Sequence, residues 1–126
     1  EPDLITIDYG RNDMFLTEEE MRMAWESMIR EAHQKNIKVL LITPAADSGA
    51  IYYEPEKRKL TDQQMAEIIR ELAEEYGTGL ADAEAVFEDL FAHGHRRSEY
   101  AASVNHPNRR GHEIVADCLA EWFPYC

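Results

Sequence analysis

The sequence predicts an α/β domain whose strands form a parallel sheet, and three observations lead to this prediction. Segments with strand character alternate with segments whose apolar residues recur every three or four positions, as in βαβ units. The run at 37–43 is apolar without a break, which is typical of a parallel strand covered on both faces. Two Thr-x-x-Glu/Gln patterns, each ahead of an apolar stripe, indicate where helices begin.

The N-terminal region predicts a strand followed by a helix. Residues 4–9 alternate in polarity and are rich in β-branched side chains, so we expect a short buried strand there. The next residues, GRND at 10–13, have a composition common in turns. Thr17 has the position of an N-cap, with Glu20 as its capping-box partner, and the helix is expected to run to about Lys35. Its predicted core stripe is Met21, Trp25, Met28, Ile29 and Ala32.

The middle of the chain repeats this pattern. Residues 37–43 form the second predicted strand, and Pro44 ends it. A loop over 45–59 follows, which is long enough to have a functional role. Thr61 begins a second capping box, and Gly77 ends the helix. The core stripe of this helix is Met65, Ile68, Ile69, Leu72 and Tyr76.

The C-terminal region predicts one more strand and two helices. A brief third strand is expected at 79–83 and a short helix at 85–92. Asn108 is placed to cap the last helix, which Pro124 ends. The apolar face of that helix is Ile114, Val115, Cys118, Leu119, Trp122 and Phe123. With no internal repeat and no linker, the 126 residues read as part or all of one domain.

Composition excludes several classes of protein. A net charge of −12 disfavours nucleic acid and anionic membranes as partners, because their phosphates would be repelled. No apolar run approaches the roughly 20 residues that span a bilayer. Two cysteines are too few for a disulfide framework, and Cys118 lies on a buried helix face. We expect a soluble protein that acts on neutral or cationic material, but the sequence distinguishes no cellular compartment, cytoplasmic or secreted.

Two polar segments are candidates for a functional site. In open α/β sheets, sites form beyond the carboxyl ends of the strands. Asn12 follows the first predicted strand directly, so its amide would reach that crevice and donate a hydrogen bond to an oxyanion. His106 lies in a loop just before the last helix and would serve as a general base near neutral pH. Each segment taken alone also fits a purely structural turn.

Together these segments resemble the SGNH hydrolases, also called GDSL-type lipases and esterases. The resemblance rests on G-x-N-D at 10–13 after a strand, and on His-Pro-Asn at 106–108 with Gly-His at 111–112 opening the last helix. It implies a flavodoxin-like three-layer α/β/α sandwich with a five-stranded parallel sheet. It also implies hydrolysis of carboxylic esters by acyl transfer, without a metal or organic cofactor. The substrate would be a small ester.

The resemblance also implies roles for individual residues. Asn12 matches the family's oxyanion-hole asparagine, and His106 matches the base that takes a proton from a serine nucleophile. Asp13 matches a position that braces the loop, and Gly10 the glycine of the same motif. The family's Gly-Asp-Ser nucleophile block has no counterpart here, so residues 1–126 are expected to be the C-terminal portion of one such domain. None of the serines present is a credible nucleophile: Ser27, Ser48, Ser98 and Ser103.

A second departure concerns the histidine. The family places an aspartate three residues before the histidine, where this chain has Ser103. Ser103, Asn105 or a backbone carbonyl would then have to orient the ring of His106. The chain alone is expected to be inactive, with its nucleophile supplied by an N-terminal segment.

Other interpretations stay open at this point. A non-catalytic flavodoxin-like module that binds a ligand or partner in the same crevice would have a similar sequence. His93-Gly94-His95 invites a metal site completed by His106 or His112, but two histidines in an arginine-flanked loop seldom bind zinc without further fixed ligands. An unprotected first strand would pair with an N-terminal fragment of the same protein or with a second copy.

Overall fold

The computed structural model describes residues 2–47, 55–103 and 106–123. Three parallel strands form the central sheet in the order β1 (Leu4–Ile7), β2 (Lys38–Ile42) and β3 (Gly79–Ala81). Leu4 pairs with Lys38 at the start of β1, and Leu40 pairs with Gly79, so β3 lies beside the second half of β2. The predicted parallel sheet is confirmed, although each strand is shorter than the predicted segment.

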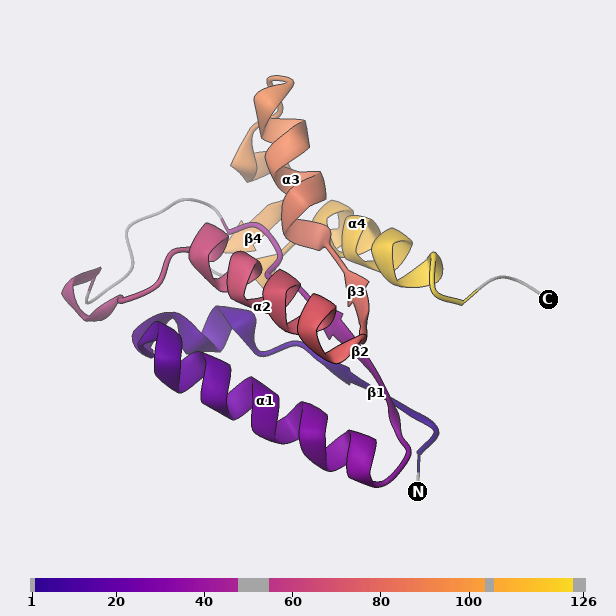
Figure 1. The fold of residues 1–126 in the computed structure, drawn as a ribbon. Helices are drawn as coiled ribbons and strands as arrows, with labels where there is room; N and C mark the ends of the chain where they lie inside the picture. Colours follow the sequence, from indigo (N-terminus) through magenta and orange to yellow (C-terminus); the bar gives the residue numbers. More distant parts are fainter. Residues whose placement is uncertain (1, 48–54, 104–105, 124–126) are drawn as a thin grey trace.

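Helices cover the sheet on both sides. The helices α1 (Glu18–Gln34) and α2 (Asp62–Tyr76) follow β1 and β2 and lie on one face (Figure 1). On the opposite side lie α3 (Ala83–Ala92) and α4 (Arg109–Ala120). Alternate residues of β2 contact the two helical layers, because successive side chains of a strand point to opposite faces. The three-layer α/β/α architecture is therefore confirmed.

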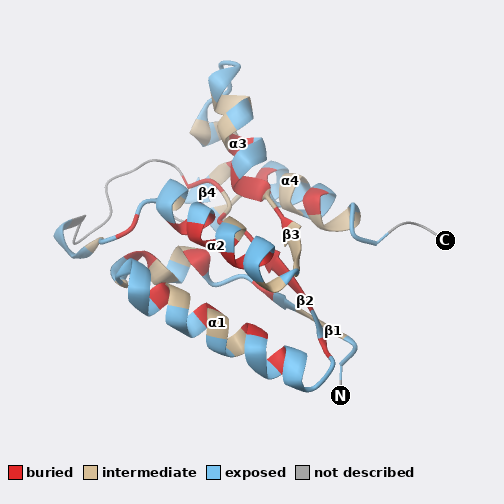
Figure 2. Ribbon diagram, in the orientation of Figure 1, coloured by how far each residue is buried: buried red, intermediate tan, exposed pale blue. Residues whose placement is uncertain are grey.

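Buried residues divide into two clusters, one on each side of the sheet (Figure 2). The larger cluster joins the sheet to α1 and α2 and contains Trp25, Met21, Ile29, Met65 and Ile69, all fully buried. The smaller cluster lies under α3 and α4 around Phe87, whose ring meets that of Tyr100 edge to face at 5.7 Å. Cys118 belongs to this cluster, and burial raises the pKa of its thiol. The predicted stripes of the first two helices are buried in the core, except that Met28 and Tyr76 are partly buried and pack against it.

Local capping sets the ends of the helices. Thr17 and Thr61 each accept a hydrogen bond from the backbone three residues ahead, and both capping boxes are complete. Gly77 ends α2 with a φ of +63°, a left-handed conformation that favours glycine. Asn108 caps α4 by accepting a hydrogen bond from the N–H of Gly111. These four predictions are confirmed.

The C-terminal prediction needs two corrections. The last helix ends at Ala120, so Trp122 and Phe123 lie beyond it and each is 50% exposed instead of belonging to its buried face. Trp122 turns back to donate a hydrogen bond to the carbonyl of Leu80 on β3. Pro124, which the sequence predicted as the end of this helix, lies outside the described residues. The short helix α3 also begins at Ala83, two residues earlier than predicted.

Not all strands belong to the parallel sheet. A second, antiparallel pair joins β4 (Ala101–Ser103) to β5 (His106–Pro107). The short 3₁₀ helix η3 (Arg97–Glu99) precedes it, and two more occur at η1 (Gly10–Phe15) and η2 (Pro55–Lys57). The sequence predicted a turn at 10–13 and a loop around His106, so both segments are more regular than expected.

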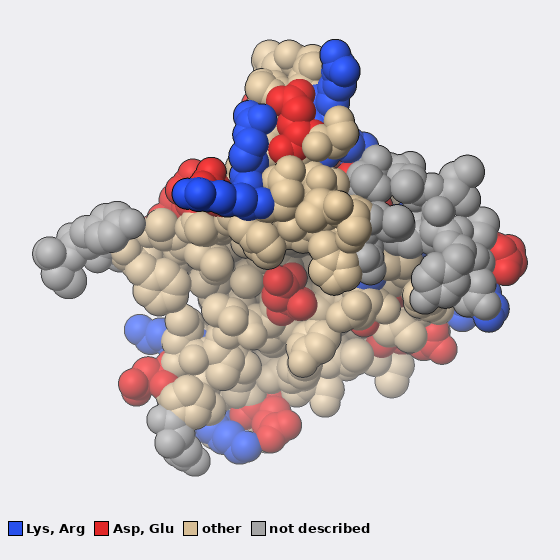
Figure 3. All heavy atoms as spheres, turned by 180° about the vertical axis from the view of Figure 1, so that it is seen from behind, with Lys and Arg blue, Asp and Glu red and all other residues tan. Residues whose placement is uncertain are grey.

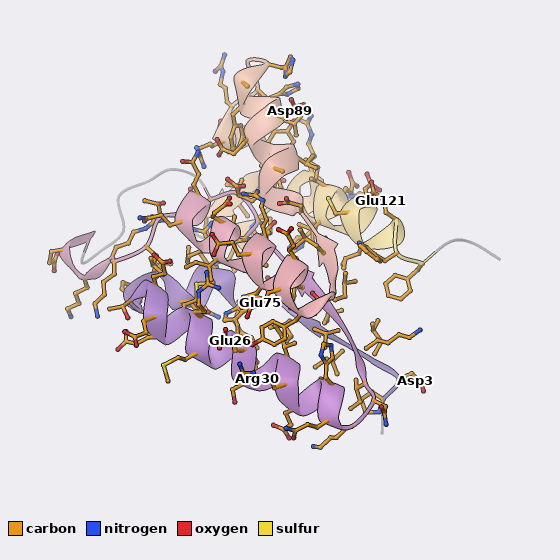
Figure 4. The ribbon with its side chains drawn as sticks, in the orientation of Figure 1. Asp3, Glu26, Arg30, Glu75, Asp89 and Glu121 are labelled. Atoms are coloured by element: carbon orange, nitrogen blue, oxygen red, sulfur yellow. The ribbon has the colours of Figure 1, made fainter. Side chains whose placement is uncertain are left out.

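A network of charged side chains links α1 to α2 on the outer surface. The guanidinium of Arg30 donates to the hydroxyl of Tyr76, and Glu26 and Glu75 lie near it at the seam between the helices (Figure 4). Arg22 forms a further ion pair with Glu71. The view from behind shows a different character: uncharged residues occupy most of the centre of that face, and most charged groups lie toward its rim (Figure 3).

Candidate active site

The carboxyl end of the sheet carries the first of the two motif segments. The helix η1 follows β1, Thr43 and Pro44 follow β2, and Asp82 follows β3. The antiparallel pair β4–β5 contains Ser103 and His106 and precedes α4. Parallel strands end at the same edge, which is where sites form in open α/β folds.

Gly10 is required by close packing. A Cβ atom at this position would lie 2.8 Å from Cγ of Pro44 and 3.2 Å from Cδ1 of Ile69. The first of these distances is shorter than any normal carbon contact, so any larger residue would push η1 away from the end of β2. The glycine of the motif therefore fixes the distance between the two loops that follow β1 and β2.

Asn12 is presented to solvent by η1. Its backbone N–H donates to the carbonyl of Tyr9 at 2.8 Å, which is the bond that forms the 3₁₀ turn. Its side chain is exposed and makes no hydrogen bond within the part of the chain that the structure describes. The amide is thus available to a ligand.

Asp13 points the other way, into the core. Its carboxylate accepts a hydrogen bond of 2.6 Å from the indole N–H of the fully buried Trp25. This contact ties η1 to α1 and is of the bracing kind that the resemblance implies. Burial raises the pKa of Asp13, against the opposing effect of the Trp25 hydrogen bond.

His106 is held by the residues that follow it. Asn108 donates from its backbone to the carbonyl of Tyr100 at 2.8 Å and from its side chain to the carbonyl of Glu99 at 2.9 Å. A Cβ atom on Gly111 would collide with the same Tyr100 carbonyl, so only glycine lets α4 begin this close to η3. The His-Pro-Asn and Gly-His motifs therefore dock the start of α4 against the preceding segment and fix the backbone of His106.

Ser103 and His106 face each other across the antiparallel pair. They are register partners in β4 and β5, and Oγ of Ser103 lies 3.4 Å from Nδ1 of His106. Both residues are exposed. The other candidate for orienting the ring, Asn105, lies outside the described residues. No hydrogen bond joins Asn12 to His106 among the described contacts.

One buried carboxylate joins η1 to η3. Asp47, 4% exposed, accepts a hydrogen bond of 2.9 Å from Arg11 and one of 3.4 Å from Arg97. Arg11 lies next to Asn12 in η1, and Arg97 lies in η3, which leads into β4. Arg11 also reaches the carbonyl of Ala45 at 2.7 Å. These three charged residues were not predicted from the sequence. Asp47 lies 36 residues from Arg11 and 50 residues from Arg97, and no local sequence pattern pairs residues so far apart.

The carboxyl groups near η1 are partly withdrawn from water. Burial raises the pKa of Asp62, which also pairs with Arg11 at 3.1 Å. Burial likewise raises the pKa of Asp8, at the end of β1, although that residue is exposed.

A second polar cluster joins the ends of β2 and β3. The buried hydroxyl of Thr43 donates to Asp82 at 3.0 Å and accepts from the N–H of Glu84 at 3.0 Å. Arg70 on α2 donates to both carboxylates. Burial raises the pKa of Asp82, but its hydrogen bonds with Arg70 and Thr43 outweigh that effect and hold it below its usual value.

For Glu84 in the same cluster, the effect of burial on the pKa exceeds the effect of the hydrogen bond with Arg70. Burial raises its pKa above the usual value in spite of the ion pair with Arg70. One of its carboxylate oxygens, Oε1, is buried and has no hydrogen-bond partner in the described part of the chain. The cluster links α2 to α3 through the bonds of Arg70 to Asp82 and Glu84.

The histidines of the predicted metal alternative have other partners. Nδ1 of His93 lies 2.8 Å from the carbonyl of Asp89, and Nδ1 of His95 lies 3.0 Å from the hydroxyl of Tyr100. Within residues 2–47, 55–103 and 106–123, no group of three or more His, Cys, Asp or Glu side chains is arranged to hold a metal ion. In the same ranges, no helix is long and apolar enough to cross a membrane.

The serines present do not form a nucleophile site in the described residues. Ser27 lies within α1, Ser98 within η3, and Ser103 beside His106 at Nδ1, the nitrogen that a nucleophile does not use. Ser48 lies outside the described residues. A cleft of about 920 Å³ opens at the opposite, amino end of the sheet, beside Lys38, Gly79 and Trp122. It contains neither motif segment, so we do not assign it to catalysis.

Comparison with known proteins agrees with the motifs. The GDSL-like lipase/acylhydrolase family matches residues 1–114. The solved structure of an acetyl xylan esterase, AlAXEase, is 25% identical with a TM-score of 0.76, and the match covers 98% of this chain and 68% of that one. No curated protein matches the sequence.

Two further solved structures share the fold. One is a catalytic serine-to-alanine mutant of an acetylxylan esterase from Geobacillus stearothermophilus, 21% identical with a TM-score of 0.79, matched over 99% of this chain and 61% of that one. The other is the lipase/acylhydrolase from Enterococcus faecalis, 24% identical with a TM-score of 0.73, matched over 97% and 61%. This chain thus spans 61–68% of the length of the three similar proteins. The family match over residues 1–114, the shared fold and the order of the motifs show that the chain belongs to the GDSL-like lipase/acylhydrolase family.

Proposed function

We propose that this protein is a serine hydrolase of carboxylic esters, in which Asn12 donates to the oxyanion and His106 is the general base. The nucleophilic serine is contributed by a segment outside these 126 residues, which form the C-terminal portion of a single domain. The observation that carries the proposal is that the buried carboxylate of Asp47 joins η1, which holds Asn12, to η3, the element that precedes β4 and His106. The mechanism requires no metal or organic cofactor.

The reaction proceeds in two acyl transfers. The serine oxygen attacks the ester carbonyl while His106 takes the hydroxyl proton, and the amide of Asn12 stabilises the negative charge that develops on the carbonyl oxygen. The tetrahedral intermediate collapses, the C–O bond to the alcohol breaks, and His106 returns its proton to the leaving alkoxide. Water then attacks the acyl-enzyme by the same route and releases the carboxylic acid and the serine.

Short acyl esters on soluble molecules are the proposed substrates. Two of the similar solved structures are described as acetylxylan esterases, which supports acetylated carbohydrate as the substrate class. The exposed positions of Asn12 and His106 fit a site open to a polymer chain or a small ester. The net charge of −12 disfavours anionic lipid surfaces and nucleic acid.

The outer edge of β1 is the proposed docking site for the segment that supplies the serine. β1 pairs with β2 on one side and with no described strand on the other, so its edge presents unpaired backbone groups. A strand added there would be continuous with the sheet and would end at the same carboxyl edge as η1. Association of two copies through this edge is the competing arrangement, and it would appear as a dimer in sedimentation.

A fluorophosphonate probe tests this function. The probe forms a covalent bond with activated serines, and intact mass spectrometry then reports the adduct. We expect one adduct on a species that contains the N-terminal segment, together with release of acetate from acetylated xylo-oligosaccharides. An unlabelled protein that binds such saccharides without hydrolysing them would instead support a non-catalytic binding module.

A further inference from the structure

Ser103 occupies the place from which a neighbour can orient the imidazole of His106. The two residues pair across β4 and β5, and Oγ of Ser103 lies 3.4 Å from Nδ1 of His106. We propose that the hydroxyl of Ser103 accepts a hydrogen bond from Nδ1–H and so holds His106 in the tautomer and orientation needed for general-base catalysis. This inference rests on the proposed function.

The chemistry requires a particular tautomer. His106 can take a proton from a nucleophile at Nε2 only if that nitrogen carries a free lone pair, so the single proton of the neutral ring must be on Nδ1. A hydroxyl oxygen has two acceptor lone pairs and can bond this proton while its own hydrogen points elsewhere. Ser103 is therefore chemically able to perform the orienting function of a carboxylate, without the carboxylate's charge.

Carboxylates near His106 have other partners. The acidic group of η3, Glu99, pairs with Arg110 at 3.6 Å, and Arg109 pairs with Glu113 within α4 at 3.0 Å. Among the described residues, no carboxylate lies within 4.0 Å of the ring nitrogens of His106, in contrast to His95, which has Glu99 at 3.4 Å. The hydroxyl is thus the described side chain that contacts the Nδ1 atom.

The backbone on both sides of the pair is fixed, which makes a weak contact sufficient to choose a rotamer. Asn108 anchors the residue after Pro107 to Tyr100 and Glu99, and the β4–β5 pairing anchors Ser103. The orientation of the His106 ring therefore depends only on the side-chain torsions of this residue. The contact of 3.4 Å is longer than a typical hydrogen bond, so it biases those torsions only weakly.

The tautomer can be measured without any substrate. The ¹⁵N chemical shifts of the imidazole distinguish a protonated ring nitrogen from a bare one, and His106→Gln assigns the signals of this histidine. Wild-type protein is compared with Ser103→Ala, Ser103→Asp and the control Ser98→Ala, an exposed serine five positions earlier in η3. Spectra are recorded above the pH at which the ring becomes neutral.

The proposal predicts four results. Wild-type His106 is predominantly protonated at Nδ1, and Ser103→Ala moves the population toward the Nε2–H tautomer, while Ser98→Ala leaves it unchanged. In Ser103→Asp the ring stays protonated to higher pH, because a carboxylate at this distance stabilises the imidazolium. A predominantly Nε2–H ring in the wild type, or identical spectra for Ser103→Ala and wild type, overturns the proposal.

Kinetics separate this inference from the proposed function. In full-length enzyme, Ser103→Ala lowers kcat about three- to tenfold with little change in KM, the effect of one neutral hydrogen bond made to the base. In Ser103→Asp the acidic limb of the pH–rate profile moves to higher pH. If no ester is hydrolysed, the proposed function fails while the tautomer result stands on its own. If esters are hydrolysed but the Ser103 variants match wild type in rate and pH profile, only the positioning role is refuted.

Discussion

Replacing Asp47 with Asn tests whether one buried carboxylate holds η1 and η3 together. The substitution keeps the shape of the side chain and removes its charge. An amide can still accept from one arginine, but its NH₂ group then faces the other guanidinium, so one of the two charge-assisted bonds is lost and the other is weakened.

The expected loss of stability follows from the exposure of each partner. The side chains of Asp47 and Arg11 are 5% and 15% exposed, and a hydrogen bond between charged groups at such a site contributes about 1.5–3 kcal/mol. The guanidinium of Arg97 is 39% exposed and its bond is longer, so solvent screening limits it to about 0–1 kcal/mol. Asp47→Asn should therefore lower the free energy of unfolding by about 1.5–4 kcal/mol.

Urea denaturation measures this effect, with Asp89→Asn as the matched control. Asp89 lies on the outward face of α3, and its side chain is 74% exposed (Figure 4). The same substitution there should change stability by less than about 0.5 kcal/mol. A double-mutant cycle with Arg97→Gln should give a coupling energy of about 0.5–1 kcal/mol with Asp47. Equal stabilities for Asp47→Asn and Asp89→Asn would refute the bridging role.

Three further predictions concern the residues that hold the site in place. Trp25→Phe removes the donor to the Asp13 carboxylate and should lower the free energy of unfolding in urea by about 1.5–3 kcal/mol. An unchanged free energy of unfolding would show that the bond is dispensable. Gly10→Ala forces a Cβ against Pro44 and should cost about 1–3 kcal/mol, measured as a lower thermal midpoint. The raised pKa of Glu84 means that the folded state binds its proton more tightly, so its contribution to stability is fully present below about pH 4.5 and is lost as the pH rises through the higher folded value. Stability relative to Glu84→Gln should fall as the pH rises above about 4.5, and a constant difference would contradict this assignment.

Local chemistry explains what the sequence predicted correctly. The capping boxes at Thr17 and Thr61 and the left-handed Gly77 depend on contacts within three or four residues, which the sequence displays directly. The continuous apolar run of β2 needs no distant information either, because a strand covered on both faces must be apolar at every position. The fold class follows from these segments and their order.

Long-range contacts explain the structural features that the sequence did not predict. At the start of η1, a 3₁₀ turn and an ordinary turn share the same bond between residues three apart, so the composition of 10–13 could not separate them. The last helix ends before Trp122, and the indole N–H of Trp122 donates to the carbonyl of Leu80 on β3, 42 residues away. The carboxylate of Asp47 joins partners that no local pattern pairs. The motif residues of the candidate site could therefore be selected from the sequence, and the long-range contacts around them could not.

The most direct test of the proposed catalytic role is the kcat of Asn12→Ala for p-nitrophenyl acetate, measured in full-length enzyme. The control is Gln34→Ala, which removes an exposed amide at the far end of α1. If the Asn12 amide donates to the oxyanion, kcat should fall about 10²–10³-fold with KM nearly unchanged. A folded Asn12→Ala enzyme whose kcat stays within about twofold of wild type and of the control would contradict the account.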